Sequence, residues 1–381
     1  MKVYPAALMD KVPAGLEISP AMKRLYEVWP VPDDRYNDFF TNFKYSRLKG
    51  LSTSSNVSRR DPSKVIKVED TYYVYYTRRK TELEPRGVVP EQCSENEPIF
   101  DWDLSDIYCA SSKDGFEWTE LGVSVLRTPE VERSLSNPDI LIWEGKYYMY
   151  YQVYSMDTKV LKENSCNIAM AYADHPTGPW IKVESAVLTK GEKGQWDSGS
   201  VFDPYPIVYK GKIWMYYGGS DFSKGDDWNT VRMQGVAIAD SPKGPFEKHE
   251  LNPLTNSGRE TFLYPYKEGI VTVLTFDGIE KNTIQYAKDG LNFEIMSYIH
   301  CPPIAAGVYS PECYLDNVEP HGVTWGLCHI EKGELKENCM SQLIRFDCDL
   351  DSRIKRQYFR NPDEYHGRYS EETYFSEKML L

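Results

Sequence analysis

The stretch RDPSKVIKVEDTYYVYYT, residues 60–77, contains the pattern that decides the fold of this 381-residue chain. An acidic residue beside a proline is followed by a strand, a tight turn at Glu69 and Asp70, and a second strand rich in tyrosine. The same order recurs in NPDILIWEGKYYMYYQ at 137–152 and in FDPYPIVYKGKIWMYYG at 202–218. A repeated strand–turn–strand unit predicts a repeated all-β architecture.

Two looser copies follow, RETFLYPYKEGIVTVLTFDG at 259–278 and SPECYLDNVEPHGVTWGLCH at 310–329. The acidic residues that open the five copies are Asp61, Asp139, Asp203, Glu260 and Glu312. Propeller blades span about 40 to 50 residues, and more where loops are inserted. The pattern therefore predicts a five-bladed β-propeller with four strands in each blade. A β-sandwich is the alternative fold, but it does not explain a fivefold repeat.

The first fifty residues have a helical pattern instead. Ser19 and Pro20 suit the start of a helix, and a second short helix would begin at Asp33 or Asp34. We therefore predict an N-terminal helical hairpin at 1–50, a propeller at 51–350 and a C-terminal extension at 351–381. The aromatic residues of the hairpin are too many for two short helices to bury. We expect them to pack on the propeller or on a second chain.

The composition excludes some partners. With 44 Lys and Arg against 57 Asp and Glu, the net charge is −13, which argues against nucleic acid and anionic membranes. No apolar run approaches the roughly 18 residues of a membrane-spanning helix. The N-terminus lacks the apolar core of a signal peptide, so we expect a cytoplasmic protein, or a periplasmic one whose signal was removed. The eight cysteines lack zinc-type spacing and are expected to be buried thiols.

The propeller geometry brings the acidic openers together, because the innermost strand of every blade starts on one face near the axis. Carboxylates held close in a funnel cannot all ionise easily, so one pKa rises while a neighbour stays low. Glycoside hydrolysis needs such an acid and base pair. For any single opener, an Asp beside a proline is also ordinary turn chemistry. Taken together, with Arg59 and Arg60 beside the first opener, they favour a sugar-binding site.

Four motifs resemble the family 117 glycoside hydrolases, which include the α-1,3-L-neoagarooligosaccharide hydrolases. They are SRRDPSKVI, DWDLSDIYCASSKDG, FDPYPIVYKGKIWMYYGG and the long stretch NSGRETFLYPYKEGIVTVLTFDGIEKNTIQYAKDGLNFEIM. The resemblance covers nearly the whole chain. It implies a five-bladed propeller and exo-acting release of 3,6-anhydro-L-galactose from agar oligosaccharides. It also implies a homodimer in which N-terminal helices are exchanged between subunits.

The resemblance also suggests roles for individual residues. Asp61 matches the catalytic base, which would activate a water and give inversion. Asp203 matches a second carboxylate that orients groups and tunes pKa values, and Glu260 matches a third. Arg60 would hold the base ionised or bind substrate oxygens. Trp102 and Tyr264 are candidates for sugar contact, with core packing as the equal alternative.

One position departs from the family pattern, which has Ser-Gly-His-Glu where this chain has Arg259 before Glu260. The histidine is the proposed general acid, and an arginine stays protonated and cannot donate that proton usefully. Three interpretations remain: Glu260 serves as the acid, the substrate differs, or the chain is a catalytically lapsed sugar-binding propeller. Arg259 could bind a sulfate or a uronate carboxylate.

Two further expectations concern metals and histidines. A channel ringed by carboxylates has the hard oxygen ligands that suit Mg²⁺ or Ca²⁺, so one divalent cation is expected there. None of the histidines is expected to replace the missing acid, and packing or solvent exposure is expected for each. They are His175, His249, His300, His321, His329 and His366.

Overall fold

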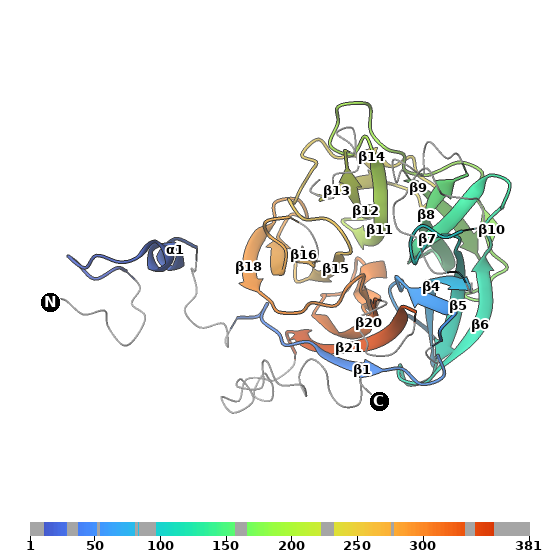
Figure 1. Ribbon diagram of the computed structural model, residues 1–381, viewed down its shortest axis with the longest axis horizontal. Coiled ribbons are helices and arrows are strands. Elements are labelled where there is room, and N and C mark those ends of the chain that lie inside the picture. The colour runs from blue at the N-terminus through green and yellow to red at the C-terminus, as the bar shows by residue number, and fades with distance from the viewer. Residues whose placement is uncertain are drawn as a thin grey trace.

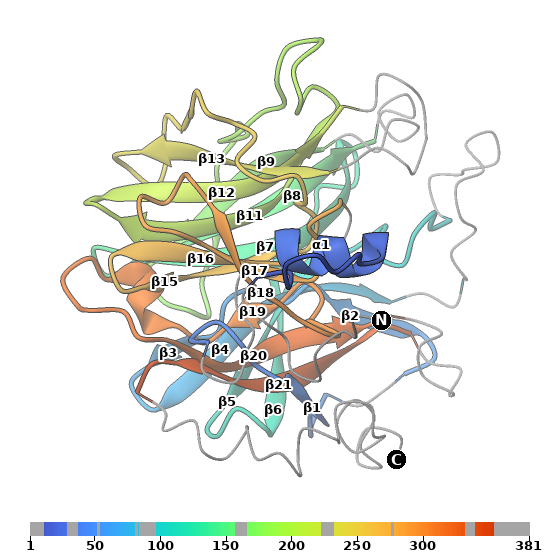
Figure 2. The same ribbon diagram turned by 90° about the vertical axis from the view of Figure 1, so that its left-hand side faces the viewer.

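A computed structural model of the protein shows five antiparallel sheets arranged around a central axis (Figure 1). It describes residues 11–28, 37–51, 54–80, 83, 97–156, 166–221, 232–275, 278–331 and 340–353. The prediction of an all-β five-bladed propeller is confirmed. Seen from the side, the strands of different blades are stacked at varied tilts (Figure 2).

Each blade is one sheet, and its strands follow one another outward from the axis. Blade 1 contains β2 (Val57–Arg60), β3 (Ile66–Val68), β4 (Thr71–Lys80), β5 (Asp106–Ser112) and β6 (Trp118–Val125). Blade 2 contains β7 (Glu132–Trp143), β8 (Lys146–Ser155), β9 (Cys166–Ala173) and β10 (Ile181–Lys182). Blade 3 contains β11 (Ser200–Tyr209), β12 (Lys212–Ser220), β13 (Met233–Ala239) and β14 (Glu247–Lys248). Blade 4 contains β15 (Phe262–Tyr266), β16 (Gly269–Leu274), β17 (Thr283–Ala287) and β18 (Glu294–Tyr298).

Blade 5 joins the two ends of the propeller. It contains β19 (Gly307–Val308), β20 (Gly322–Ile330) and β21 (Gln342–Asp351), and a short 3₁₀ helix, η3 (Pro311–Tyr314), lies between the first two. Its outermost strand is β1 (Lys44–Arg47), which pairs antiparallel with β21. The ring is therefore closed by hydrogen bonds between an early segment and a late one, which removes an exposed sheet edge.

The described N-terminal residues show one of the two predicted helices. It is α1 (Pro20–Val28), which lies outside the ring of blades (Figure 1). Residues 37–43, where the second helix was expected to continue, adopt turns and extended backbone; 29–36 lie outside the described residues. The packing of aromatic side chains on the propeller outweighs helix propensity here: Phe39 packs on Tyr266, and Phe43 packs on Phe346. No described helix is long and apolar enough to cross a membrane.

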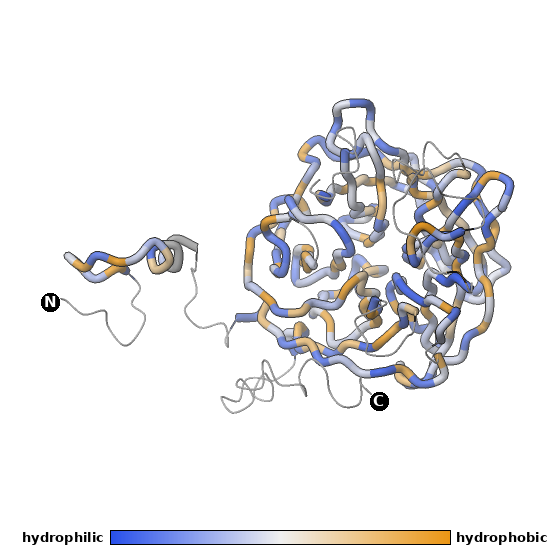
Figure 3. The backbone as a smooth tube through the Cα atoms, in the orientation of Figure 1, coloured by the Kyte–Doolittle hydropathy of each residue, from blue (hydrophilic) through white to orange (hydrophobic). Residues whose placement is uncertain are grey.

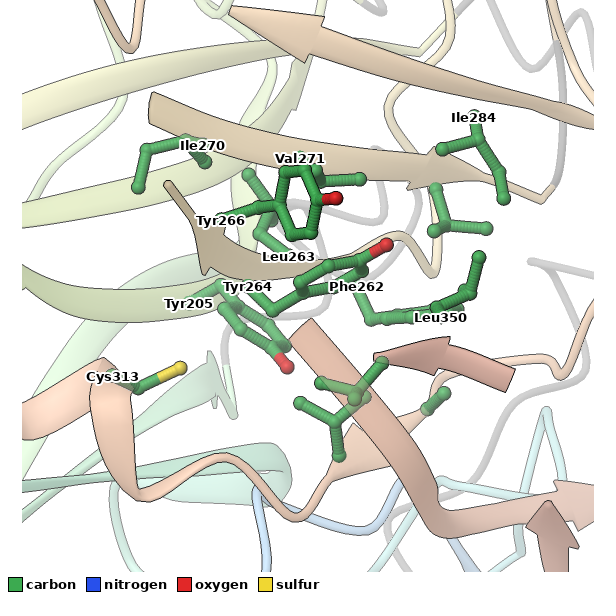
Figure 4. Packing of buried hydrophobic residues seen from close by; sticks show 14 of the residues in the cluster. Tyr205, Phe262, Leu263, Tyr264, Tyr266, Ile270, Val271, Ile284, Cys313 and Leu350 are labelled. Atoms are coloured by element: carbon green, nitrogen blue, oxygen red, sulfur yellow. The ribbon is translucent and has the colours of Figure 1, made fainter. Parts of the chain in front are cut away.

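The hydrophobic core lies within and between the blades. The largest buried cluster joins blades 3, 4 and 5 (Figure 4). Hydrophobic and hydrophilic residues are interspersed along the strands rather than collected on one face of the molecule (Figure 3). The six cysteines of the described residues are thiols, and all except Cys301 are buried, so that residue departs from the expected burial.

Candidate active site

Five residues at the start of the blades line one cavity of about 340 Å³ on the propeller axis. They are Asp61, Asn137, Asp203, Glu260 and Ala305, and all have φ between 46° and 55°. In blades 2 and 3 the strand register shifts at this position, between Ser136 and Asp139 and between Phe202 and Tyr205. Bulges of this kind re-aim a side chain and are frequent beside active sites. The left-handed backbone of five non-glycine residues marks one structurally equivalent ring.

This ring corrects two of the predicted openers. In blade 2 the equivalent residue is Asn137, and Asp139 lies two residues further along β7. In blade 5 the equivalent residue is Ala305, whereas Glu312 lies in η3. The sequence repeats align Asp139 and Glu312 with the acidic residues of the other blades. In the structure, a bulge in blade 2 and a longer loop in blade 5 move both residues away from the equivalent position. The ring therefore holds three carboxylates rather than five.

A larger cavity adjoins the ring at its mouth. Its volume is about 580 Å³ including the open entrance, and it shares Asn137, Asp203 and Glu260 with the narrower space. The other lining residues are Arg60, Phe100, Trp102, Gln152, Tyr154, Ser200, Phe202, Arg232 and Arg259. Blades 1 to 4 all contribute, so the cavity is walled on several sides like a pocket that receives the end of a chain.

Asp61 is held by a cation on one side and a histidine on the other. Arg60 Nε donates to both carboxylate oxygens of Asp61, at 3.1 and 3.2 Å. His329 Nδ1 accepts the backbone N–H of Asp61 at 3.2 Å, which places the ring proton on Nε2. The side chains of Arg60, Asp61 and His329 are all almost fully buried. Asp61 therefore has a fixed orientation and a guanidinium in contact with both of its carboxylate oxygens.

Asp203 and Glu260 form a second carboxylate pair, on blades 3 and 4. Asp203 accepts the amide of Asn137 at 2.5 Å and the backbone N–H of Glu260 at 2.8 Å. Burial, with the negative charge of Glu260, raises the pKa of Asp203 to about 7. Glu260 contacts two guanidinium groups, Arg259 Nη2 at 3.4 Å and Arg60 Nη2 at 3.7 Å. The two neighbouring carboxyl groups therefore have different partners: Asp203 faces an amide and a backbone N–H, and Glu260 faces two guanidinium groups.

Arg60 is buried among several carboxylates of the site. Burial works to lower the pKa of Arg60, but Asp61 and Glu260 outweigh it and raise that pKa. Arg60 also reaches Glu331 at 3.5 Å. Contact with the His329 ring and the charges of Arg60 and Arg259 lower the pKa of Glu331 to about 2. Arg60 therefore contacts three carboxylates, Asp61, Glu260 and Glu331.

The two aromatic candidates for sugar contact lie in different places. Trp102 lines the larger cavity and stacks between Phe100, at 4.9 Å, and Tyr154, at 4.5 Å between ring centroids. Tyr264 lines neither cavity: it is 1% exposed and packs in the core on β15 (Figure 4). Trp102 lies in a turn, whereas Tyr264 lies within β15, whose five residues are all buried.

The divalent cation expected in the channel stays a prediction. In the part of the chain that the structure describes, no group of three or more His, Cys, Asp or Glu is placed to hold a metal ion. Asp61, Asp203 and Glu260 face guanidinium, amide and backbone N–H groups.

Sequence reasoning missed three residues of this site. His329 was expected to be packed or exposed, and it is buried as expected, but its contact with Asp61 from the end of β20 was not assigned. Arg232 lines the larger cavity at 7% exposure, just before β13. Asn137 stood in the quoted repeat but was passed over for Asp139. Only the Asn-Pro pair could have indicated its place, by analogy with the Asp-Pro pairs of blades 1 and 3.

Comparison with known proteins agrees with this geometry. The family described as glycosyl hydrolases family 43 matches residues 55–234. A solved family 117 glycoside hydrolase produced by the marine bacterium Zobellia galactanivorans is 42% identical. It covers 87% of this chain and 99% of its own, with a TM-score of 0.78. Among curated proteins, none shows a significant match.

Two more distant structures share the fold alone. RS223-β-xylosidase is 18% identical, covers 77% of this chain and 93% of its own, and has a TM-score of 0.51. The GH43 β-xylosidase/α-arabinofuranosidase CoXyl43, from a compost microbial metagenome, is 17% identical over 79% and 94%, with a TM-score of 0.50. The 42% identity over almost the whole of the Zobellia protein is decisive, and this chain belongs to glycoside hydrolase family 117.

Proposed function

We propose that this glycoside hydrolase is exo-acting and inverting, and that it releases a terminal sugar of the 3,6-anhydro-galactose type from marine galactan oligosaccharides. The observation that carries the proposal is the pairing of an Asp61 carboxylate held beside a cation with an Asp203–Glu260 pair that retains a proton. The walled pocket supports attack at a chain end rather than within a chain.

The proposed reaction assigns a proton transfer to each side of the pocket. Asp61 accepts a proton from a water as the water oxygen bonds to the anomeric carbon. The Asp203–Glu260 pair gives its proton to the departing glycosidic oxygen as the carbon–oxygen bond breaks. Attack and departure on opposite faces of the sugar invert the anomeric configuration. Asp203 is the resting place of the proton, because Glu260 faces two guanidinium groups and Asp203 faces neutral donors.

Arg60 and His329 act on Asp61 rather than on the sugar. The Arg60 guanidinium orients the Asp61 carboxylate through its Nε, and the His329 imidazole accepts the backbone N–H of Asp61, a residue with left-handed φ. Arg259 occupies the place of the acid histidine in the family pattern and cannot transfer a proton. We therefore assign the acid to the carboxylate pair. The predicted exchange of N-terminal helices within a homodimer remains part of this proposal.

The test is terminal-sugar release from neoagaro-, carrageenan- and ulvan-type oligosaccharides, read by chromatography, with the anomer of the product followed by NMR. Wild-type protein should release one sugar at a time with inversion. Asp61→Asn should lower the rate by about 10² to 10⁴-fold, the usual contribution of a general base. Asp70→Asn, at an 82% exposed carboxylate of the same blade, is the matched control and should leave the rate unchanged.

A lapsed sugar-binding propeller is the second candidate, and Arg259 at the acid position is the observation that favours it. Binding of an oligosaccharide with no release of sugar by wild-type protein would support this candidate and overturn the catalytic proposal. Release that survives in Asp61→Asn would instead overturn the role of Asp61 as base.

A further inference from the structure

The wall of the larger cavity that carries Trp102 is a turn between two aspartates, each paired with a buried arginine. Asp101, Trp102 and Asp103 follow one another in the connection from β4 to β5. Trp102 lines the cavity together with Phe100, and the centroids of the two stacked rings lie 4.9 Å apart. Connecting segments are more mobile than strands, so contacts with the rest of the protein have to fix the direction of a side chain in a turn.

Asp103 is held from the neighbouring blade. Arg133 of β7 donates from Nε to Asp103 Oδ1 at 2.9 Å and from Nη2 to Asp103 Oδ2 at 2.6 Å. Only 1% of the arginine side chain and 2% of the aspartate side chain are exposed. The same carboxylate accepts the backbone N–H groups of Ile99 and Leu104, at 2.8 and 2.9 Å. The pair therefore fixes the turn of blade 1 against blade 2.

Asp101 is held in a similar way from within blade 1. Arg79 of β4 donates from Nη2 to Asp101 Oδ1 at 2.8 Å and from Nε to the Asp101 backbone carbonyl at 3.0 Å. Ser58 Oγ donates to the other carboxylate oxygen at 2.7 Å. The backbone carbonyl of Trp102 itself accepts the hydroxyl of Ser105 at 2.6 Å. Both ends of the turn and its centre are therefore fixed.

The burial of these two ion pairs suits a role in geometry better than a role in stability. Two charges that are buried together lose their hydration, and such a pair is often no more stabilising than apolar side chains of the same volume. A guanidinium and a carboxylate that meet through two parallel hydrogen bonds do define one relative orientation. At this turn, that orientation sets where Trp102 lies relative to Asp203 and Glu260, which line the same cavity.

We propose that Arg79 and Arg133 are positioning residues for the substrate, which hold Trp102 as a rigid wall against which the terminal sugar ring packs. The proposal rests on the hydrolase function proposed above and deepens it. Both arginine side chains are at most 2% exposed, so each acts through its aspartate rather than on the sugar. A wall that is ordered before binding avoids the ordering of a side chain on binding, which would weaken affinity about twofold to tenfold.

The first test needs no ligand. In protein labelled with 5-fluorotryptophan, fluorine NMR follows the Trp102 signal, which Trp102→Phe identifies. Arg133→Lys and Arg79→Lys keep the charge but lose the two-point contact, so each should shift or broaden that signal. Arg345→Lys is the matched control, because Arg345 contacts Asp347 in blade 5 through Nη2 at 2.7 Å and Nε at 3.1 Å. It should leave the Trp102 signal unchanged.

The second test measures the consequence for the sugar. Neoagaro-, carrageenan- and ulvan-type oligosaccharides are titrated by calorimetry into the Asp61→Asn protein, and the one that binds most tightly is used for the variants. Arg133→Lys and Arg79→Lys should each weaken its binding about twofold to tenfold, with thermal unfolding as the check that each variant is folded. In a Trp102→Leu background, the same substitutions should have no further effect, because the wall that they position is absent.

An unmoved Trp102 signal in both arginine variants would overturn the proposal. Binding losses that persist in full in the Trp102→Leu background would also overturn it, because they would show that the arginines act elsewhere. Hydrolysis of an oligosaccharide whose binding is insensitive to Trp102→Leu would overturn the sugar wall and leave the hydrolase function intact. Absence of both binding and hydrolysis for every oligosaccharide would instead overturn the proposed function, and the sugar contact with it.

Discussion

The mouth and the floor of the central channel each contain a buried aspartate, and the two have different partners. At the mouth, Asp203 accepts from Asn137 and the Glu260 backbone and has Glu260 as its charged neighbour. Deeper in the channel, Asp139 of β7 contacts the ammonium of Lys64 and accepts its backbone N–H at 2.8 Å. Burial raises the pKa of both carboxyl groups, but Lys64 opposes the rise at Asp139.

The comparison shows that burial alone does not make a carboxylate reactive. Lys64 is fully buried and lies 4.0 Å above the Tyr205 ring, so the Asp139 pair ties blades 1 and 2 to blade 3. Its charges are matched within the protein, and a matched pair has no proton to offer. Asp203 is left beside a like charge, which keeps a proton within reach at neutral pH.

The largest change in the free energy of unfolding is expected from breaking the Lys64–Asp139 pair on the floor of the channel. Lys64→Met should lower the free energy of unfolding by about 3–5 kcal/mol, because it leaves Asp139 buried without a countercharge. Denaturant unfolding measures the change. The double variant Lys64→Met/Asp139→Leu removes both charges and should recover most of the loss. A double variant as unstable as the single one would show that the pair is not what makes Lys64 important.

Asp203→Asn should raise the free energy of unfolding at alkaline pH, whereas Lys64→Met lowers it. The pKa of Asp203 is about 7 in the folded protein, against 3.8 for an ordinary aspartate, so its contribution to stability is fully present below pH 3.8 and is lost as pH rises through 7. The substitution should therefore stabilise the protein by about 1–4 kcal/mol at pH 8 and have little effect at about pH 4. Urea unfolding at both pH values is the measurement.

Asp139→Asn is the matched control for that experiment. It should destabilise the protein at pH 8, because Lys64 loses its partner. Stabilisation by both substitutions, or by neither, would remove the proposed difference between mouth and floor.

The pH dependence of the activity should follow the protonation of Asp203. The rate should fall as pH rises through about 7, where Asp203 loses its proton. Arg259 lowers the pKa of Asp203, so Arg259→Gln should move this alkaline limb upward by about one pH unit. The pH dependence of kcat/KM on a neutral oligosaccharide measures the limb. Arg127→Gln, at a half-buried arginine that contacts Asp106 of blade 1, should not move it. An unmoved limb in Arg259→Gln would disconnect Arg259 from the acid.

The smallest effect is expected at the exposed ion pairs of the blade hairpins. Lys146 contacts Asp174 in blade 2, and Lys212 contacts Asp240 in blade 3, each at 2.9 Å and with half or more of both side chains exposed. Lys146→Gln should leave the free energy of unfolding nearly unchanged, because water screens the pair. A loss comparable to that of Lys64→Met would contradict the dominant role of burial.

The sequence by itself determined the repeat, the propeller and the family. These depend on local features: period-two strands, two-residue turns and an acidic residue at the head of a blade, all visible in 60–77 and 202–218. It also identified Asp61, Asp203 and Glu260, which the structure places on one ring.

Only the tertiary structure decided which residues surround that ring. A bulge places Asn137 rather than Asp139 at the mouth, and the Asn-Pro pair is the one local feature of the sequence that could have indicated this shift of register. His329 meets Asp61 across 268 positions of the chain, and β1 pairs with β21 across about 300 positions, contacts that only closure of the propeller creates. Tyr264 looks like any other aromatic residue of these strands, and the packing of β15 alone places it in the core. The side chains that carry charge were readable from the sequence, whereas their neighbours, and hence their pKa values, were set by how the blades meet.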